Sequence, residues 1–380
     1  MVISVLEFDY HAEVLRDLLR IASNSNGTLQ LRVFTNDFVW NRVQWQDANY
    51  TPEIYIANGS VPSFVTANKS LIEDADYIVL QTMDSHFKFW ASITWAVPFY
   101  IRVHNSIAFF GKPSWKPILT PRMIWKDISH FLRKGLFHGE IGYRKRAVQK
   151  ASGYLFPTTG TLKYAIEELN APTDKCHAIP MGASIPLRLP KPNVTEGINI
   201  AIIGKIEPRN RDYETVLGAL EILSKQSVNT HLTLAGRSDN SYAEKLVQHI
   251  EELPYITVNS FTGYVPQNQL EQVISNAKFL IAPVVQSVRF HLHNEYYGYT
   301  KVSGAELDLI KYQKHVLFPA YYPIPKGMEA VTGRYGNSKE LATHITRWGN
   351  PNNLLDAKAF DSIPQVEFKR IVEQYSALPK

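Results

Sequence analysis

The sequence predicts an α/β protein of two domains, each built on a parallel sheet. Short β-branched or apolar runs alternate with amphipathic helical patterns along most of the chain, and such alternation produces parallel strands joined by right-handed crossovers. This rhythm stops at 181–197, a proline-rich stretch with little apolar mass, and then restarts. The length of 380 residues, 45% of them apolar, is sufficient for two domains with full cores.

The order of elements is similar in the two halves. In the first half, strands are expected at 2–8, 29–36, 75–83, 98–105, 153–159 and 176–182, and helices at 11–22 and 160–169. In the second half, strands are expected at 198–204, 230–236, 256–264, 278–284 and 314–320, and helices at 212–225, 241–253, 267–277 and 366–377.

These patterns predict the domain boundaries. We expect an N-terminal domain at 1–185, a linker at 186–197, a C-terminal domain at 198–360 and a helical segment at 361–380. In paired α/β domains, ligands bind at the carboxyl ends of the strands, facing the cleft between the domains. Candidate functional residues are therefore those that directly follow strands.

Composition limits the classes of protein that fit. The single cysteine, Cys176, cannot form an internal disulfide and suits a reducing compartment. The N-terminus turns polar within ten residues, unlike a signal peptide. The longest apolar stretch, 89–101, is too short to cross a bilayer. We therefore expect a cytoplasmic protein.

The net charge of +5 is unevenly distributed. Residues 112–150 contain ten Lys and Arg residues but only two acids, Asp127 and Glu140, with aromatic residues between them. A solvated helical surface is one explanation. The other is a peripheral contact with an anionic membrane surface or with an acidic, lipid-linked acceptor. No nucleic-acid recognition motif accompanies the charge, so no nucleic-acid partner is expected.

The first candidate site follows the strand at 198–204. Gly204 permits a tight turn, and Lys205, Arg209 and Arg211 place cations just before the next helix. A helix N-terminus beside cations suits a diphosphate group. A basic surface turn has the same composition, so this stretch alone does not decide between the two. Neither G-x-x-x-x-G-K-[ST] nor a G-x-G-x-x-G after a strand is present.

The second candidate site is EYYGYTKVSGAELD at 295–308, between a strand and a helix. Glu295 is expected in a loop at the carboxyl end of the strand, where a carboxylate can accept hydrogen bonds from sugar hydroxyls. Gly298 has no Cβ, so its backbone can approach a phosphate closely. The following backbone N–H groups can then point at phosphate oxygens. These groups belong to Tyr299, Thr300 and Lys301.

Both motifs resemble those of retaining glycosyltransferases with the GT-B fold, particularly glycosyltransferase family 4. The family has a glycine–basic turn after the first strand of its second domain, similar to GKIEPRNRDYE at 204–214. It also has an E-x-x-G donor loop, similar to EYYG at 295–298. The resemblance covers roughly 198–320 and is only topological over 1–180. It implies two Rossmann-like domains facing each other across a cleft, with the C-terminal helix packed back on the first domain.

The resemblance also implies roles for particular residues. Lys205 and Arg211 would stabilise the leaving diphosphate, Glu295 would orient the sugar, and His104 would bind the sugar from the first domain. Without the resemblance, a lone His after a strand is more often structural. The other residues expected to bind the donor are Gly204, Arg209, Gly298, Tyr299, Thr300, Lys301 and Ser303.

Two positions depart from the family pattern. The family has a second Glu eight residues after the first, which binds the ribose, and this chain has Ser303 there. Ser303 and Glu306 also have the spacing of a helix capping box, and the two roles do not exclude each other. In addition, the loop after the first strand, where Asp9, Tyr10 and His11 lie, lacks the glycines of the family.

No metal site or cofactor is expected. The pair His291-x-His293 beside Glu295 fits no common zinc spacing. Asp74-Ala75-Asp76 leads directly into a strand, as a polar strand entry does. We interpret both as structural.

Together these features predict a metal-independent glycosyltransferase that moves a sugar from a nucleotide diphosphate to a glycan or lipid-linked acceptor, with retention by resemblance. One alternative is a nucleotide-sugar epimerase of the same fold. Another is a non-catalytic binding or scaffold protein, which Ser303 and the missing glycines would favour.

Overall fold

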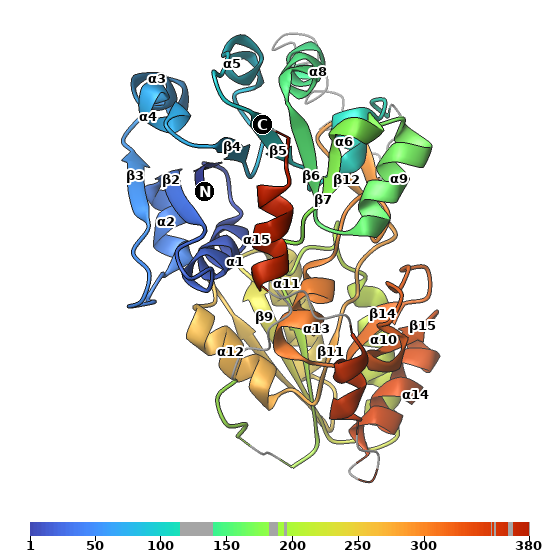
Figure 1. Ribbon diagram of the computed structural model, residues 1–380. Coiled ribbons are helices and arrows are strands. Elements are labelled where there is room, and N and C mark those ends of the chain that lie inside the picture. Colours follow the sequence, from blue (N-terminus) through green and yellow to red (C-terminus); the bar gives the residue numbers. More distant parts are fainter. Residues whose placement is uncertain are drawn as a thin grey trace.

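The computed structural model describes residues 1–114, 140–181, 189–193, 196–350, 352, 355–363 and 368–379. It contains two large parallel sheets, one in each half of the chain, with helices on their faces (Figure 1). The predicted fold class is therefore confirmed. Most of the basic segment 112–150 and part of the predicted linker lie outside the described residues, and the exact domain boundaries stay a prediction.

The first sheet has seven parallel strands in the order β3-β2-β1-β4-β5-β6-β7. These strands are β1 (Val2–Glu7), β2 (Gln30–Asn36), β3 (Glu53–Ala57), β4 (Tyr77–Leu80), β5 (Phe99–Arg102), β6 (Gly153–Phe156) and β7 (Cys176–Ala178). The order reverses between β1 and β4, and ligands of open α/β sheets bind outside the carboxyl ends at such a point. The edge strand β3 was not predicted, because half-buried side chains give it a weak hydrophobic signal.

Helices cover both faces of this sheet. They are α1 (Ala12–Ser23), α2 (Asp37–Val43), α3 (Val61–Ala67), α4 (Lys69–Glu73), α5 (Phe87–Ser92), α6 (Ser106–Phe110), α8 (Glu140–Lys150) and α9 (Thr159–Leu169). Helix α1 shows why an amphipathic pattern forms a helix here, since its apolar residues, Leu15 and Leu18 among them, are buried against β1.

The second sheet has six parallel strands in the order β10-β9-β8-β11-β14-β15. The strands are β8 (Ile198–Ile203), β9 (Thr230–Arg237), β10 (Ile256–Phe261), β11 (Phe279–Ile281), β14 (Val316–Pro319) and β15 (Thr332–Tyr335). The helices are α10 (Tyr213–Lys225), α11 (Ser241–Glu251), α12 (Gln267–Asn276), α13 (Gly304–Tyr312) and α14 (Ser338–Gly349). Here the order reverses between β8 and β11.

The segment between β11 and α13 differs from its prediction. It was expected to be a loop, but it contains an antiparallel hairpin of β12 (Ser287–Phe290) and β13 (His293–Tyr296). Glu295 lies within β13, opposite Val288. The hairpin forms a separate two-stranded sheet that extends from the second domain to the first.

The C-terminal helix α15 (Phe368–Ser376) packs in the core of the first sheet. Ile371, Val372 and Tyr375 belong to the same buried cluster as Ile3 of β1. The Tyr375 hydroxyl lies 2.5 Å from Nη2 of the buried Arg102 at the end of β5. Both ends of the chain therefore lie in the same half of the molecule (Figure 1).

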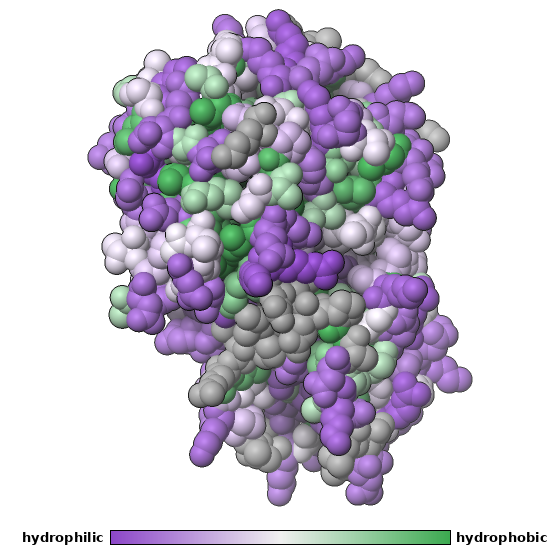
Figure 2. Space-filling model, in the orientation of Figure 1, coloured by the Kyte–Doolittle hydropathy of each residue, from purple (hydrophilic) through white to green (hydrophobic). Residues whose placement is uncertain are grey.

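The face shown in Figure 2 is mainly hydrophilic, and its hydrophobic residues occur in small separate groups, mostly over the half that contains the first sheet. Among the described residues, none of the helices has the length and apolar character needed to cross a membrane.

Candidate functional site at the domain junction

The hairpin of the second domain meets helix α6 of the first. The Ser106 N–H donates to the Thr300 carbonyl at 2.9 Å, and the Lys301 Nζ donates to Asn105 Oδ1 at 2.9 Å. Because α6 starts just after β5 and Thr300 comes shortly before α13, these bonds join the carboxyl end of the first sheet to the loop that enters α13.

Glu295 is fully buried in this junction. Its carboxylate accepts the backbone N–H groups of Ala108 at 2.7 Å and Ile107 at 3.2 Å, at the start of α6. It therefore satisfies free N–H groups of a helix in the other domain. Burial raises the pKa of Glu295, and hydrogen bonds from Thr300 and from the two backbone groups oppose that rise. The expected position in a loop is wrong, because Glu295 lies within β13, and both of its carboxylate oxygens accept hydrogen bonds inside the protein.

The residues after Glu295 form a tight turn. Gly298 has φ +83°, and its N–H donates to the Lys301 carbonyl at 2.7 Å. A Cβ on Gly298 would overlap the Pro323 ring. Thr300 is buried, whereas Tyr299 is exposed and its ring lies 6.0 Å from that of Tyr164. The glycine is thus required by the turn itself. The N–H groups of Tyr299, Thr300 and Lys301 all point to the Tyr296 carbonyl, so in this structure they are not free for the phosphate contact predicted from the sequence.

Lys301 is surrounded by groups of both domains. Besides Asn105, its ammonium lies 5.7 Å from the Phe290 ring centre. Burial lowers the pKa of Lys301, and the negative charges of Glu295 and Asp84 oppose that effect. The Lys301 ammonium is therefore held between the hairpin and the first domain.

The predicted cationic turn follows β8. Gly204 has φ +102°, and a Cβ there would overlap the Arg211 guanidinium. The Arg211 Nη2 donates to the Ile203 carbonyl at 2.6 Å, while Nε is buried without a hydrogen-bond partner among the described residues. A Cβ on Gly236 would overlap the Gly204 backbone, so the ends of β8 and β9 approach closely. Arg211 is thus fixed over the glycine turn.

The other two cations of this turn lie on the surface. Lys205 is paired with Glu207 at 3.1 Å, and its side chain is about half exposed. Arg209 is also exposed. The structure therefore brings Gly204 and Arg211 into contact, and it leaves Lys205 and Arg209 pointing outward from the same turn.

Ser303 caps helix α13. Its Oγ accepts the Ala305 N–H at 3.3 Å. The other half of the expected capping box runs through a third residue, since the Tyr322 hydroxyl accepts the Ser303 N–H at 3.3 Å and lies 2.5 Å from the Glu306 carboxylate. Ser303 is buried. The helix start is nevertheless open at Gly304, where a Cβ would meet nothing within 4 Å.

His104 lies two residues after β5. Its Nε2 is 2.8 Å from the Gln81 carbonyl oxygen, so this nitrogen carries the proton and Nδ1 is an acceptor. The ring stacks on His11, with centroids 4.1 Å apart and planes at 13°. Burial, then the charges of His11 and Arg102, lower the pKa of His104 well below its ordinary value. His104 is therefore a neutral imidazole at pH 7.

Two carboxyl groups at the same sheet edge were not predicted. Glu7 ends β1, is fully buried and accepts the Thr82 hydroxyl at 2.6 Å. Burial raises its pKa to about 7. Burial and the negative charge of Asp9 also raise the pKa of Asp84 to about 7, and Asp84 Oδ2 is buried without a hydrogen-bond partner among the described residues. Asp84 comes directly after the strand predicted at 75–83. A position at the carboxyl end of a predicted strand is also what identified His104.

In the described part of the basic segment 112–150, one of the basic side chains is buried inside the protein. Arg144 of α8 is buried, pairs with Glu140 at 2.8 Å and lies over the Phe87 ring. His291 of the hairpin approaches the same Glu140 carboxylate at 3.3 Å. Arg144 therefore belongs to the domain junction, so the interpretation of 112–150 as a solvated or membrane-facing surface does not hold for this residue.

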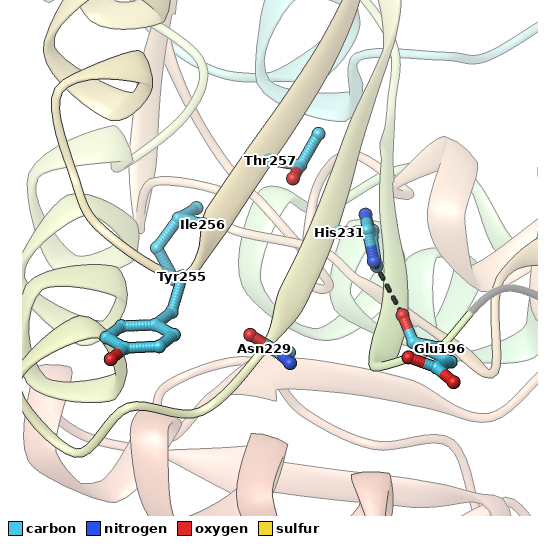
Figure 3. A pocket seen from close by; sticks show the side chains of 6 residues that line it. All are labelled: Glu196, Asn229, His231, Tyr255, Ile256 and Thr257. Atoms are coloured by element: carbon cyan, nitrogen blue, oxygen red, sulfur yellow. Dashed lines mark hydrogen bonds between the residues drawn. The ribbon is translucent and has the colours of Figure 1, made fainter.

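A shallow pocket of about 400 Å³ lies elsewhere (Figure 3). It is lined by Glu196, Asn229, His231, Tyr255, Ile256 and Thr257. These residues lie at or just before the amino-terminal ends of β8, β9 and β10, so the pocket is at the edge of the sheet opposite the candidate site. Within the described parts of the chain, no group of three or more His, Cys, Asp or Glu side chains is arranged to hold a metal ion.

No protein-family model and no curated protein sequence matches the chain. Solved structures do match over its whole length. A glycosyltransferase from Rickettsia africae is similar over 99% of this chain and 96% of its own, with 11% identity and a TM-score of 0.62. Anabaena HepE, solved in complex with UDP-glucose, is similar over 99% and 98%, with 14% identity and a TM-score of 0.62. The UDP-GlcNAc 2-epimerase of Methanocaldococcus jannaschii is similar over 100% and 99%, with 11% identity and a TM-score of 0.53.

At such low identities, these likenesses concern the fold. They agree with the two parallel-sheet α/β domains of the chain. Membership of family 4 stays a prediction. The chain has the GT-B fold of nucleotide-sugar glycosyltransferases.

Proposed function

We propose that the protein is a glycosyltransferase that takes a sugar from a nucleotide diphosphate and passes it to a hydroxyl acceptor. The observation that carries this proposal is the meeting of two sheet edges at one junction. The bond from Ser106 to Thr300 joins the carboxyl end of β5 to the entry of α13. The first candidate site follows β8 of the second sheet, and the second lies between the hairpin and α13.

The donor side is proposed at the glycine turn after β8 and the start of α13. Arg211 would neutralise charge that develops on the diphosphate as the glycosidic bond breaks. The open helix start at Gly304 would contribute the positive end of the helix dipole. Lys205 and Arg209 lie on the same turn and would bind the outer phosphate oxygens. With these cations, the leaving group is stabilised without a metal ion.

The sugar would lie between Lys301 and His104. Burial and neighbouring charges keep His104 neutral, so its Nδ1 can accept a hydrogen bond from a sugar hydroxyl. Glu295 would act indirectly by fixing the hairpin to α6, rather than by holding the sugar. The Ser303 hydroxyl is used to cap α13. We therefore propose that a ribose contact comes from neighbouring residues in the loop that enters α13.

The remaining details rest on the sequence alone. We propose retention of the anomeric configuration, a glycan or lipid-linked acceptor, and action in the cytoplasm with peripheral contact to an anionic membrane through 112–150. A polysaccharide or glycolipid pathway would use such a reaction.

The test is a turnover assay with UDP-, GDP- and ADP-sugars, followed by ion chromatography of the nucleotide and NMR of the sugar. With an acceptor mixture of oligosaccharides and polyprenyl phosphate sugars, we expect nucleoside diphosphate and a new glycoside in equal amounts. The anomeric coupling constant of that glycoside tests retention.

The likeness to a UDP-GlcNAc 2-epimerase makes epimerisation the second candidate. The buried carboxyls Glu7 and Asp84, whose pKa values lie at about 7, could exchange protons with a sugar carbon. In the same assay, an epimerase would form a new nucleotide sugar, or free sugar, without an acceptor. A protein that binds a nucleotide sugar and turns over none would be a binding or scaffold protein.

A further inference from the structure

The pocket of Figure 3 has no part in the proposed function. Its volume of about 400 Å³ lies within the range of small-molecule pockets, about 300–1,000 Å³. It lies where β8, β9 and β10 begin, and these strands are neighbours in the second sheet. Because β9 has eight residues that rise about 3.3 Å each, the pocket is about 25 Å from the edge of the sheet where the donor is proposed to bind. A small ligand in this pocket would therefore not reach the proposed donor site.

Tyr255, the residue before β10, has a strained backbone. Its φ is +63°, in the left-handed region that suits glycine or asparagine and is unfavourable for a bulky side chain. The turn is fixed on both sides, since the Tyr255 carbonyl accepts the Thr230 N–H at 3.0 Å and the Ile256 N–H donates to the Leu253 carbonyl at 3.3 Å. Burial does not compensate for the strain, because 53% of Tyr255 is exposed. Neither the turn nor the core explains a tyrosine here, which points to a use for its exposed ring.

The other side chains of the pocket are available for hydrogen bonds. His231 and Thr257 lie opposite each other in the register of β9 and β10, so both point to the same face of the sheet. His231 Nε2 donates to the Glu196 carbonyl at 2.7 Å (Figure 3), which leaves Nδ1 as an acceptor. Among the described residues, this Nδ1, the Thr257 hydroxyl and the side chains of Asn229 and Glu196 have no hydrogen-bond partner.

Gly197 fixes the wall of the pocket on the β8 side. Its φ is +101°, and a Cβ there would lie 2.9 Å from the Asn229 carbonyl oxygen and 3.1 Å from His231 Cδ2. The same Asn229 carbonyl accepts the Ile198 N–H at 2.9 Å. The chain passes this close to β9 because residue 197 is a glycine, and the close approach places Glu196 beside His231.

The lining of the pocket excludes phosphates. Glu196 is its only acid, and none of the six lining residues is Lys or Arg. The phosphates of a nucleotide would therefore meet a carboxylate without a compensating cation. The pocket is thus unsuited to the proposed donor.

A neutral sugar suits the same lining. Its hydroxyls donate and accept hydrogen bonds, as the amide, hydroxyl and imidazole groups of the pocket do. The C–H face of a sugar ring is apolar and can pack on the Tyr255 ring. Tyr255, Asn229 and Glu196 belong to three adjacent strand ends and form a row in Figure 3. With strands about 4.8 Å apart, the row is about 10 Å long, about the length of a disaccharide.

We propose that this pocket is a secondary binding site for a neutral glycan chain. One sugar ring packs on Tyr255, and the hydroxyls of this ring and the next bond to His231 Nδ1, Thr257, Asn229 and the Glu196 carboxylate. No covalent bond is made or broken there.

The use of such a site rests on the proposed function. A polymeric acceptor held at this edge of the sheet stays beside the protein while its reacting end enters and leaves the transfer site, which raises the effective concentration of that end. A trisaccharide is too short to span the distance of about 25 Å between the two places, so it gains no such advantage.

The test measures binding first, without a donor. Maltohexaose, cellohexaose and chitohexaose are titrated by calorimetry into the wild type, Tyr255→Asn and Glu196→Gln. Glu329→Gln is the control for the loss of an exposed carboxylate, since Glu329 does not line the pocket. Asparagine is tolerated at positive φ, so Tyr255→Asn should unfold at the Tm of the wild type or above it. A loss of binding by this variant is then not a loss of folding.

We expect one hexasaccharide to bind the wild type and Glu329→Gln with a Kd of about 1 mM or tighter. Tyr255→Asn should bind it about tenfold more weakly and Glu196→Gln about threefold more weakly. Both variants should bind UDP as the wild type does, because the donor site is at the other edge of the sheet. With a working donor, Tyr255→Asn should raise the KM of the polysaccharide of the bound sugar by about tenfold and leave kcat and the KM of its trisaccharide unchanged.

Two results would overturn the secondary site: no binding of any hexasaccharide by the wild type, or equal affinities for the wild type and Tyr255→Asn. Weaker UDP binding by Tyr255→Asn would contradict its separation from the donor site. An unchanged KM for the polysaccharide would overturn its role in holding the acceptor. A wild type that binds a hexasaccharide through Tyr255 but transfers no sugar from any donor would overturn the proposed function and support the glycan site.

Discussion

Replacing Glu295 by Gln tests whether this residue joins the two domains. The carboxylate accepts N–H groups from Ala108 and Ile107 with one oxygen each. In Glu295→Gln one oxygen remains an acceptor, but the other becomes an NH2 group that faces an N–H. One charge-assisted hydrogen bond, about 1.5–3 kcal/mol, is lost, and Lys301 loses a nearby negative charge.

The neutral amide is easier to bury, which offsets part of the loss, so we expect the free energy of unfolding to fall by about 2 kcal/mol. At about 2–4 °C per kcal/mol for domains of this size, the Tm should fall by roughly 4–8 °C in calorimetry. The control is Glu329→Gln, an exposed carboxylate that accepts one backbone N–H, from Gly327, with an expected change within about 0.5 kcal/mol.

An unchanged Tm, together with loss of nucleotide-sugar binding, would refute this reasoning. It would mean that Glu295 leaves α6 to hold the donor, as the family resemblance implies. A lower Tm with donor binding retained would support the junction described above.

Three further predictions concern buried groups. Burial raises the pKa of Glu306 to about 7, so the folded protein binds this proton more tightly than the unfolded chain, and the associated stability is present at acid pH and lost as the pH rises from about 4.5 through 7. Glu306→Gln should therefore raise the Tm at pH 8 but not at pH 4.5, and equal pH slopes for the two proteins would contradict this. Gly298→Ala should lower stability by about 2 kcal/mol or more, because φ is +83° and the Cβ overlaps Pro323. A urea midpoint equal to that of the wild type would show that the turn is not as described. Tyr375→Phe leaves the buried Arg102 without one hydrogen-bond partner, which should cost about 1–3 kcal/mol. Limited proteolysis should then release the C-terminal helix earlier than in the wild type, and identical digestion would argue against that anchor.

The fold was largely predictable because its signals are local. The central strands are short apolar runs that are buried on both faces, as β4 and β5 show. The helices have apolar stripes, and α10 also has a side-chain cap from Asp212 at its start. Such features need no knowledge of the rest of the chain. The edge strand β3 has a weaker pattern, so it was missed.

The candidate site was less predictable because distant residues make it. Glu295 and Ala108 are 187 positions apart, and nothing in EYYG indicates a partner helix in the other domain. The hairpin has little apolar alternation of its own and is held by contacts of this kind. The pair of Ser303 and Glu306 was recognised from its spacing, but its link through Tyr322 was not. Asp84, like His104, lies at the carboxyl end of a predicted strand, so it could have been identified from the sequence.

The central claim is that Arg211 and the glycine turn hold the diphosphate of a sugar donor. The most direct test is calorimetric titration of the wild type, Arg211→Ala and a control, Lys245→Ala on the exposed side of α11, with UDP, GDP and ADP. We predict that one nucleotide binds to the wild type and to the control with a Kd in the micromolar range, and about tenfold more weakly to Arg211→Ala, a loss of about 1.4 kcal/mol. Equal affinities for the wild type and Arg211→Ala, or no binding of any nucleotide, would contradict the claim.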